Sequence, residues 1–267
     1  MYCLLRVENN QMHPAEIPKS SYDILIDGYS KLQEVIDIFK GFYQYKNALV
    51  ELESWCRSAD TDSSLLLKNQ EIAERMCQGI LTAFKNYLEH MKQHIKDKYG
   101  TESAFYAVYD TSRANARNTS DEFTFVYELR NYAQHQNSIV HSFLNTKAYL
   151  QPASDPSTLL SQYTNWNQRE KAYILRHPKG IDLQDAFEKA YNALGLIHKP
   201  VIQYLSDNSD AGKNFSMFRT WMDKTFSRDE AKFYSLATVE RKDGSQATMD
   251  DYKHGVPDLE FKATVID

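Results

Sequence analysis

Apolar residues at helical spacing run through this sequence in long stripes. Residues that recur every three or four positions lie on one face of an α-helix, so each stripe predicts a helix with one buried face. Such stripes cover residues 25–43 and 183–201, and the clearest one consists of Ile72, Met76, Ile80, Phe84, Tyr87, Met91 and Ile95. With only 9 glycines and 7 prolines in 267 residues, the chain has few turn formers. We therefore expect a mainly α-helical fold, organised as a helical bundle.

Two prolines suggest where the chain divides. A third long helix is predicted over residues 121–149, and Pro152 and Pro156 interrupt the pattern directly after it. We expect a helical bundle over 1–152 and a helical extension over 153–267. The extension contains short helices within 157–176, a helix capped by Asp182, a helix over 214–226 and a final β-hairpin. That hairpin joins strands over 233–239 and 259–266, and a short strand is also expected over 2–8.

Charge and cysteine content narrow the class of protein. The net charge of −5 argues against a general nucleic-acid coat protein, which needs a broad excess of Lys and Arg. It leaves room for a local basic groove. Cys3, Cys56 and Cys77 have unrelated spacings, so we expect free thiols in a reducing compartment. The apolar segments are too short for a signal peptide or a membrane span, which favours a cytoplasmic protein without membrane contact.

The helix expected over 121–149 has an unusual polar face. On a helical wheel with Arg130 at zero, its apolar residues fill an arc from about 180° to 320°. The opposite arc holds Arg130, Asn131, Gln134, His135, Ser138 and His141. Between Asn131 and Thr146 the sequence contains no Asp, Glu, Lys or Arg. Exposed helical faces normally carry charges, so this face suits a cleft or a symmetric interface between subunits.

Arginine and histidine on such a face are suited to phosphodiester chemistry. A guanidinium binds a phosphate bidentately and offsets the charge that builds in the transition state. An imidazole with a pKa near neutrality transfers protons to and from the reacting oxygens. Asn131 and His135 share one ridge of the helix, whereas Arg130 and His135 lie about 140° apart. Two copies of the helix facing each other would gather both arginines and both histidines around one point.

The run Arg130-Asn131-Tyr132-Ala133-Gln134-His135 resembles the R-x(4–6)-H motif of the HEPN superfamily of small helical domains. The resemblance covers residues 20–150, but these six residues carry it. It implies a metal-independent endoribonuclease that acts as a homodimer and needs no cofactor. In such an enzyme the RNA 2′-hydroxyl attacks the adjacent phosphate and leaves a cyclic phosphate. Arg130 would hold the phosphate, His135 would be the acid and base, and Asn131 would orient His135 or the scissile group.

The resemblance also implies a biological role. Proteins with this motif often act as toxins or as effectors of phage defence, so an antitoxin or another regulatory protein is an expected partner. The substrate would be single-stranded or looped RNA. The residues that follow the motif helix depart from the simplest members of the family, and this leaves the symmetric dimer geometry open.

Further residues are candidates for contacts with RNA. Arg113 and Arg117 precede the motif helix in a stretch without acids and could hold phosphates, although loop arginines without a partner are more common. Gln134 and His141 share the polar face and are candidates for supporting roles, with His141 favoured as an interface group. His90 and His94 have the spacing of metal ligands, but no matching Cys or acidic cluster accompanies them, so no metal site is expected.

Two other functions remain open from sequence. The uncharged face could dock a partner protein in a helical module without catalytic activity. The chain could also be a regulatory partner of a nucleotidyltransferase, as some HEPN domains are, and the neighbouring reading frame would then discriminate. If expression of the protein is toxic and His135→Ala relieves the toxicity, the chain is an enzyme rather than a docking module or a regulatory partner.

Overall fold

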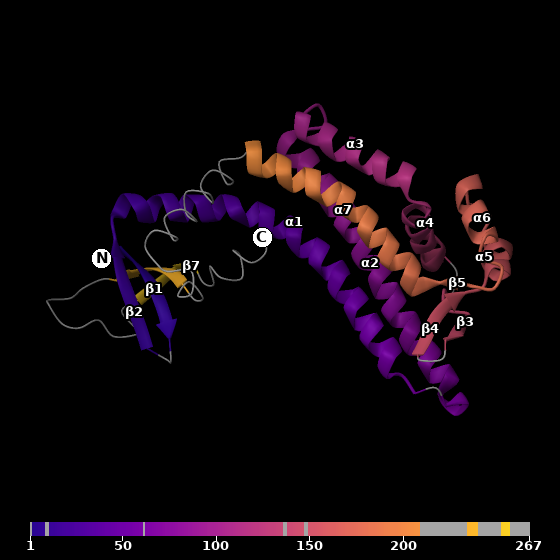
Figure 1. The fold of residues 1–267 in the computed structure, drawn as a ribbon. Helices are drawn as coiled ribbons and strands as arrows, with labels where there is room; N and C mark the ends of the chain where they lie inside the picture. Colours follow the sequence, from indigo (N-terminus) through magenta and orange to yellow (C-terminus); the bar gives the residue numbers. More distant parts are fainter. Residues whose placement is uncertain are drawn as a thin grey trace. The chain divides into compact units, whose positions relative to one another are not determined.

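A computed structural model gives the arrangement of the chain (Figure 1). Contacts divide the chain into two compact units, one formed by residues 1–39 and 202–267 and the other by residues 40–201. The boundary expected at residues 152–153 falls in a strand of the second unit. The structure describes residues 2–8, 11–60, 62–135, 138–146, 149–208, 234–239 and 252–256.

The first unit contains a four-stranded antiparallel sheet in the order β2-β1-β6-β7. Its strands are β1 (Tyr2–Glu8), β2 (Gln11–Ile17), β6 (Tyr234–Val239) and β7 (Tyr252–Val256). The strands expected over 2–8 and 233–239 are confirmed. Strand β6 also pairs with β7. The strand expected over 259–266 lies outside the described residues. The helix expected over 214–226 lies outside them as well.

The helices confirm a mainly α-helical fold. They are α1 (Lys19–Ser58), the 3-10 helix η1 (Ser63–Leu65), α2 (Leu66–Tyr99), α3 (Ala104–Thr119), α4 (Asp121–His135), α5 (Pro156–Gln162), α6 (Gln168–Leu175) and α7 (Leu183–Asn208). Helix α1 starts in the first unit and continues into the second.

The ends of the long helices follow from local sequence signals. Helix α2 ends at Tyr99. Its C-cap, Gly100, has a φ of +82° and donates its N–H to the Lys96 carbonyl 2.9 Å away. Before α7, the Asp182 carboxylate accepts a hydrogen bond of 3.1 Å from the Asp185 N–H, as an N-cap should. The apolar stripe of α7 is fully buried at Leu183, Phe187, Ala190, Leu194, Ile197 and Val201.

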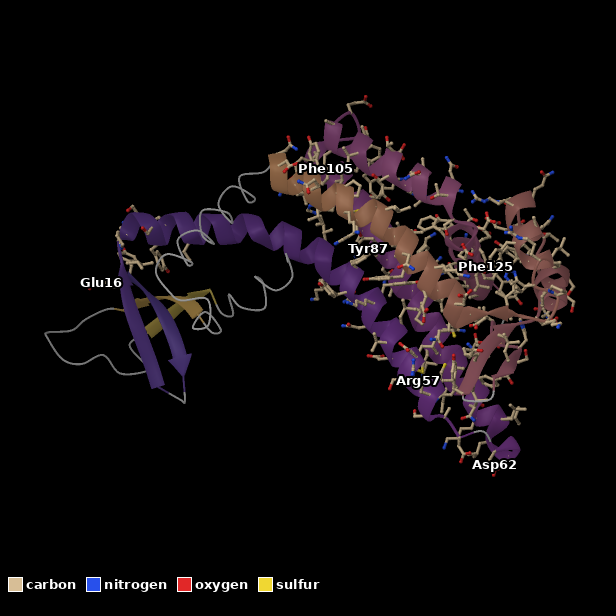
Figure 2. The ribbon with its side chains drawn as sticks, viewed as in Figure 1. Glu16, Arg57, Asp62, Tyr87, Phe105 and Phe125 are labelled. Carbon is tan, nitrogen blue, oxygen red and sulfur yellow. The ribbon has the colours of Figure 1, made fainter. Side chains whose placement is uncertain are left out.

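Aromatic side chains fill the core of the second unit, where Tyr87, Phe105 and Phe125 are labelled in Figure 2. The Phe84 ring meets the Phe123 ring edge-on, with 5.3 Å between centroids, and joins α2 to α4. Phe125 stacks on Trp166 with 5.9 Å between centroids and joins α4 to the segment before α6. The core face predicted for α4 is confirmed within the helix, since Phe125, Val126, Leu129 and Tyr132 are fully buried.

A small antiparallel sheet overturns one prediction of the sequence analysis. The third long helix does not extend to residue 149. It ends at His135, and the chain continues into β3 (Ser142–Thr146), β4 (Tyr149–Ser154) and the short β5 (Ile181–Asp182). Ile139 and Val140 are buried as expected, but in an irregular segment before β3. The sequence analysis assigned these two apolar residues to a helical stripe, whereas they belong to a segment without regular secondary structure.

The structure can be compared with the expectations on free cysteines and on membrane-spanning segments. Cys56 and Cys77 are free thiols and fully buried, and the side chain of Cys3 is not described. Within the part of the chain that the structure describes, no helix combines the length and the apolar character needed to cross a lipid bilayer.

Candidate functional site

The candidate site lies in the last turns of α4. Ser120 starts this helix: its hydroxyl accepts a 3.0 Å hydrogen bond from the Phe123 N–H, and Asp121 and Glu122 place acids in the first turn. Inward-facing Phe125, Val126, Leu129 and Tyr132 are fully buried and fix the rotation of the helix.

Arg130 and Asn131 are both half-buried, and each is held by its own helix. The Arg130 guanidinium donates from Nη1 to the amide oxygen of Gln134, which is exposed one turn later. The Asn131 amide donates from Nδ2 to Glu128 Oε2 over 3.0 Å, in the direction of the preceding turn. His135 is the last residue of α4, and its side chain is outside the described part of the chain. The structure thus brings Arg130, Asn131 and Gln134 together at one end of the helix.

The polar arc predicted for this helix does not face solvent along its whole length. Phe123 lies at about 20° on the wheel that has Arg130 at zero, yet it is fully buried against α2. Tyr127, one turn before Arg130, accepts a 3.3 Å hydrogen bond from the Lys85 ammonium of α2. That ammonium also pairs with Glu89 at 3.2 Å. The flank of α4 that carries Arg130 is therefore packed against α2 in its first turns and is polar only towards its end.

His141 is not on the motif helix, so the prediction that it shares a helical face with Arg130 and Gln134 is wrong, and the same holds for Ser138. The His141 N–H donates to the Ala153 carbonyl over 2.9 Å, and its Nδ1 accepts from the Asp155 N–H over 3.0 Å. Burial lowers the pKa of this imidazole below its usual value. These contacts give His141 a role in joining the small sheet to the start of α5.

Arg113 and Arg117 lie on helix α3 rather than in the loop expected there. Arg113 is half-buried and Arg117 is exposed. Arg169 of α6 donates to the carbonyls of Arg117 and Asn118 and also pairs with Asp121. The Arg117 backbone thus forms part of a corner that locks the end of α3 to the start of α4, while its side chain reaches the surface.

Sequence reasoning missed the residues that support the motif from elsewhere in the chain. Glu128 accepts hydrogen bonds from Asn131 and from the hydroxyl of Tyr163, which follows α5. Tyr132 donates from its hydroxyl to Gln162 Oε1 over 2.7 Å. Glu128 precedes Asn131 by one turn and was detectable as a helical neighbour. Tyr163 had no local signal that linked it to the motif.

Among the residues that the structure describes, no three or more His, Cys, Asp or Glu side chains gather as ligands for a metal ion. His90 is exposed and His94 is half-buried on α2.

Comparison with known proteins found no match to this chain. No family profile matches it, and neither a curated protein nor a solved structure matches it.

Proposed function

We propose that the chain is a metal-independent endoribonuclease of HEPN type that acts on single-stranded or looped RNA as a dimer. One observation carries the proposal. Arg130, Asn131 and His135 occupy the end of a single helix, and Arg130 and Asn131 are half-buried and each oriented by a hydrogen bond. A guanidinium that is already held in place loses less conformational entropy when it binds a phosphate.

The proposed reaction needs one base and one acid. His135 of one subunit accepts the proton of the RNA 2′-hydroxyl, and the 2′-oxygen forms a bond to the adjacent phosphorus. The bond from phosphorus to the 5′-oxygen breaks, and the partner's imidazole gives that oxygen a proton. Arg130 binds the phosphate and offsets the charge of the transition state. The products are a 2′,3′-cyclic phosphate and a 5′-hydroxyl.

Cleavage in the presence of a chelator tests the proposal. Purified full-length protein should cut single-stranded RNA in EDTA and leave cyclic phosphate ends. His135→Ala and Arg130→Ala should each lower the rate by at least about a hundredfold. Glu71→Ala, which changes an exposed glutamate of α2 outside the motif, is the control and should change the rate less than twofold. Cleavage that needs a metal, or that survives both His135→Ala and Arg130→Ala, would overturn the proposal.

A second function is favoured by the same contacts. Arg130 and Asn131 already have partners inside the chain, Gln134 and Glu128, as expected of a stabilised polar helix face that docks another protein. On this alternative, expression of the wild type neither slows growth nor cleaves RNA. On the first proposal, expression slows growth and His135→Ala relieves the effect without changing the thermal unfolding midpoint.

A further inference from the structure

The carboxylate of Glu128 lies between the motif and the segment that follows α5. Its Oε2 accepts from Asn131 Nδ2 at 3.0 Å, and its Oε1 accepts from the hydroxyl of Tyr163. Glu128 is half-buried, and Tyr163 is buried. Neither bond contributes to the regular backbone structure of α4, so both are available to set the geometry of a site.

This contact determines which way the Asn131 amide faces. A carboxylate only accepts hydrogen bonds, so the group that Asn131 turns towards Glu128 must be its NH₂. The amide oxygen lies on the other side of the same planar group and therefore points away from Glu128. Asn131 thus presents an acceptor, which suits the N–H of an imidazole or the hydroxyl of a ribose and not the oxygens of a phosphate.

Tyr163 keeps the carboxylate in place. Burial, and after it the hydrogen bond to Glu128, raises the pKa of the Tyr163 hydroxyl to about 12. The hydroxyl therefore keeps its proton at neutral pH and remains a donor. Burial raises the pKa of Glu170 on α6, and the negative charge of Glu128 raises it further, while Arg117 lowers it.

The charges around the motif are therefore unequal on its two sides. Arg130 supplies positive charge, while Glu128 supplies negative charge on the side of Asn131, about 160° away around the helix. A phosphate is attracted to the first side and repelled from the second. We infer that Glu128 is a positioning residue, whose carboxylate holds the Asn131 amide so that its oxygen is free to accept a hydrogen bond from the ribose of the substrate. This inference rests on the proposed function.

Kinetics of Glu128 variants test the inference. Glu128→Ala removes the acceptor for Asn131 and should lower kcat about tenfold or more with less than a threefold change in KM. Glu128→Gln keeps an acceptor oxygen and should recover at least half of the lost rate. The double variant Asn131→Ala/Glu128→Ala should be no slower than Asn131→Ala alone, because Glu128 acts through Asn131. Glu71→Ala, an exposed glutamate on α2, is the matched control.

Additive losses in the double variant, a Glu128→Gln as slow as Glu128→Ala, or an unchanged kcat in Glu128→Ala would each overturn the inference. If Glu128→Ala does not fold, Tyr163→Phe replaces it and should lower kcat without changing KM. Hydrogen exchange of the Asn131 side-chain amide, followed by NMR, gives a readout independent of cleavage, and it should speed up at least tenfold in Glu128→Ala. Absence of cleavage by the wild type overturns the proposed function, whereas unchanged amide exchange overturns the positioning contact itself.

Discussion

The imidazole of His198 lies inside the helical unit, on α7. Its Nδ1 is 2.7 Å from the Tyr87 hydroxyl, and its ring stacks on Phe42 with 4.0 Å between centroids. Burial lowers the pKa of His198 from 6.5 to about 4, because the charged form loses its hydration among aromatic rings. The neutral imidazole is therefore the form that fits this core.

We predict that acid destabilises the protein through this residue. Between pH 6.5 and about 4, His198 is protonated in the unfolded chain but stays neutral in the folded one. The free energy of unfolding is therefore at its highest above pH 6.5 and falls as the pH drops. The loss should reach about 3 kcal/mol at pH 4. Urea unfolding across this range should show the slope in the wild type and a smaller one in His198→Gln. A residual slope is expected from His141, whose pKa is also lowered. An equal slope in both proteins would exclude His198 as the cause.

At the scale of elements, the end of α4 depends on a residue of another helix. The Glu74 carboxylate on α2 accepts hydrogen bonds from the Ser138 hydroxyl at 2.7 Å and from the N–H groups of Ile139 and Val140 at 2.9 and 2.8 Å. Gln70 donates to the Val140 carbonyl over 2.6 Å. These bonds occupy backbone groups that a continued helix would need, so they hold the chain in its turn towards β3.

Removing this carboxylate should therefore loosen the segment after the motif helix. We predict that Glu74→Ala lowers the free energy of unfolding by about 2 kcal/mol, because it leaves two partly buried N–H groups without an acceptor. Hydrogen exchange at Ile139 and Val140 should be faster, while exchange in the middle of α2 stays slow. Glu71→Ala on the same helix should stay within about 0.5 kcal/mol of the wild type. Unchanged exchange at both amides would contradict the prediction.

The contrast between α7 and α4 indicates what could be predicted from sequence. The apolar stripe of α7 and its cap at Asp182 are local signals, and both are present in the structure. The end of α4 depends on Glu74, far away in the sequence, and on strand pairing such as that of Phe143 with Pro152. Ile139 and Val140 fit a helical period by chance, and no local breaker marked the true end.

The same distinction holds for the candidate site. Arg130, Asn131 and Gln134 were predictable as neighbours because their spacing alone puts them at one end of a helix. Their orientation was not, since it depends on the packing of Phe123 against α2 and on the contact of Tyr163 with Glu128. His141 was placed on α4 because the prediction extended this helix beyond its true end at His135. The candidate residues were thus visible in sequence, while the residues that hold them came from the fold.

At the scale of the whole molecule, the proposed reaction requires two chains, because one imidazole takes a proton while the other gives one. An inactive subunit should then reduce the activity of its partner. We predict that wild-type protein mixed with a threefold excess of His135→Ala loses activity per wild-type chain, because mixed dimers hold a single imidazole. The same amount of wild type mixed with an equal excess of an unrelated inert protein should keep its activity. RNA cleavage and mass by light scattering should be measured on the same mixtures. Equal cleavage in both mixtures, with wild type eluting as a monomer, would mean that each chain carries a complete site and that the two-imidazole mechanism is wrong.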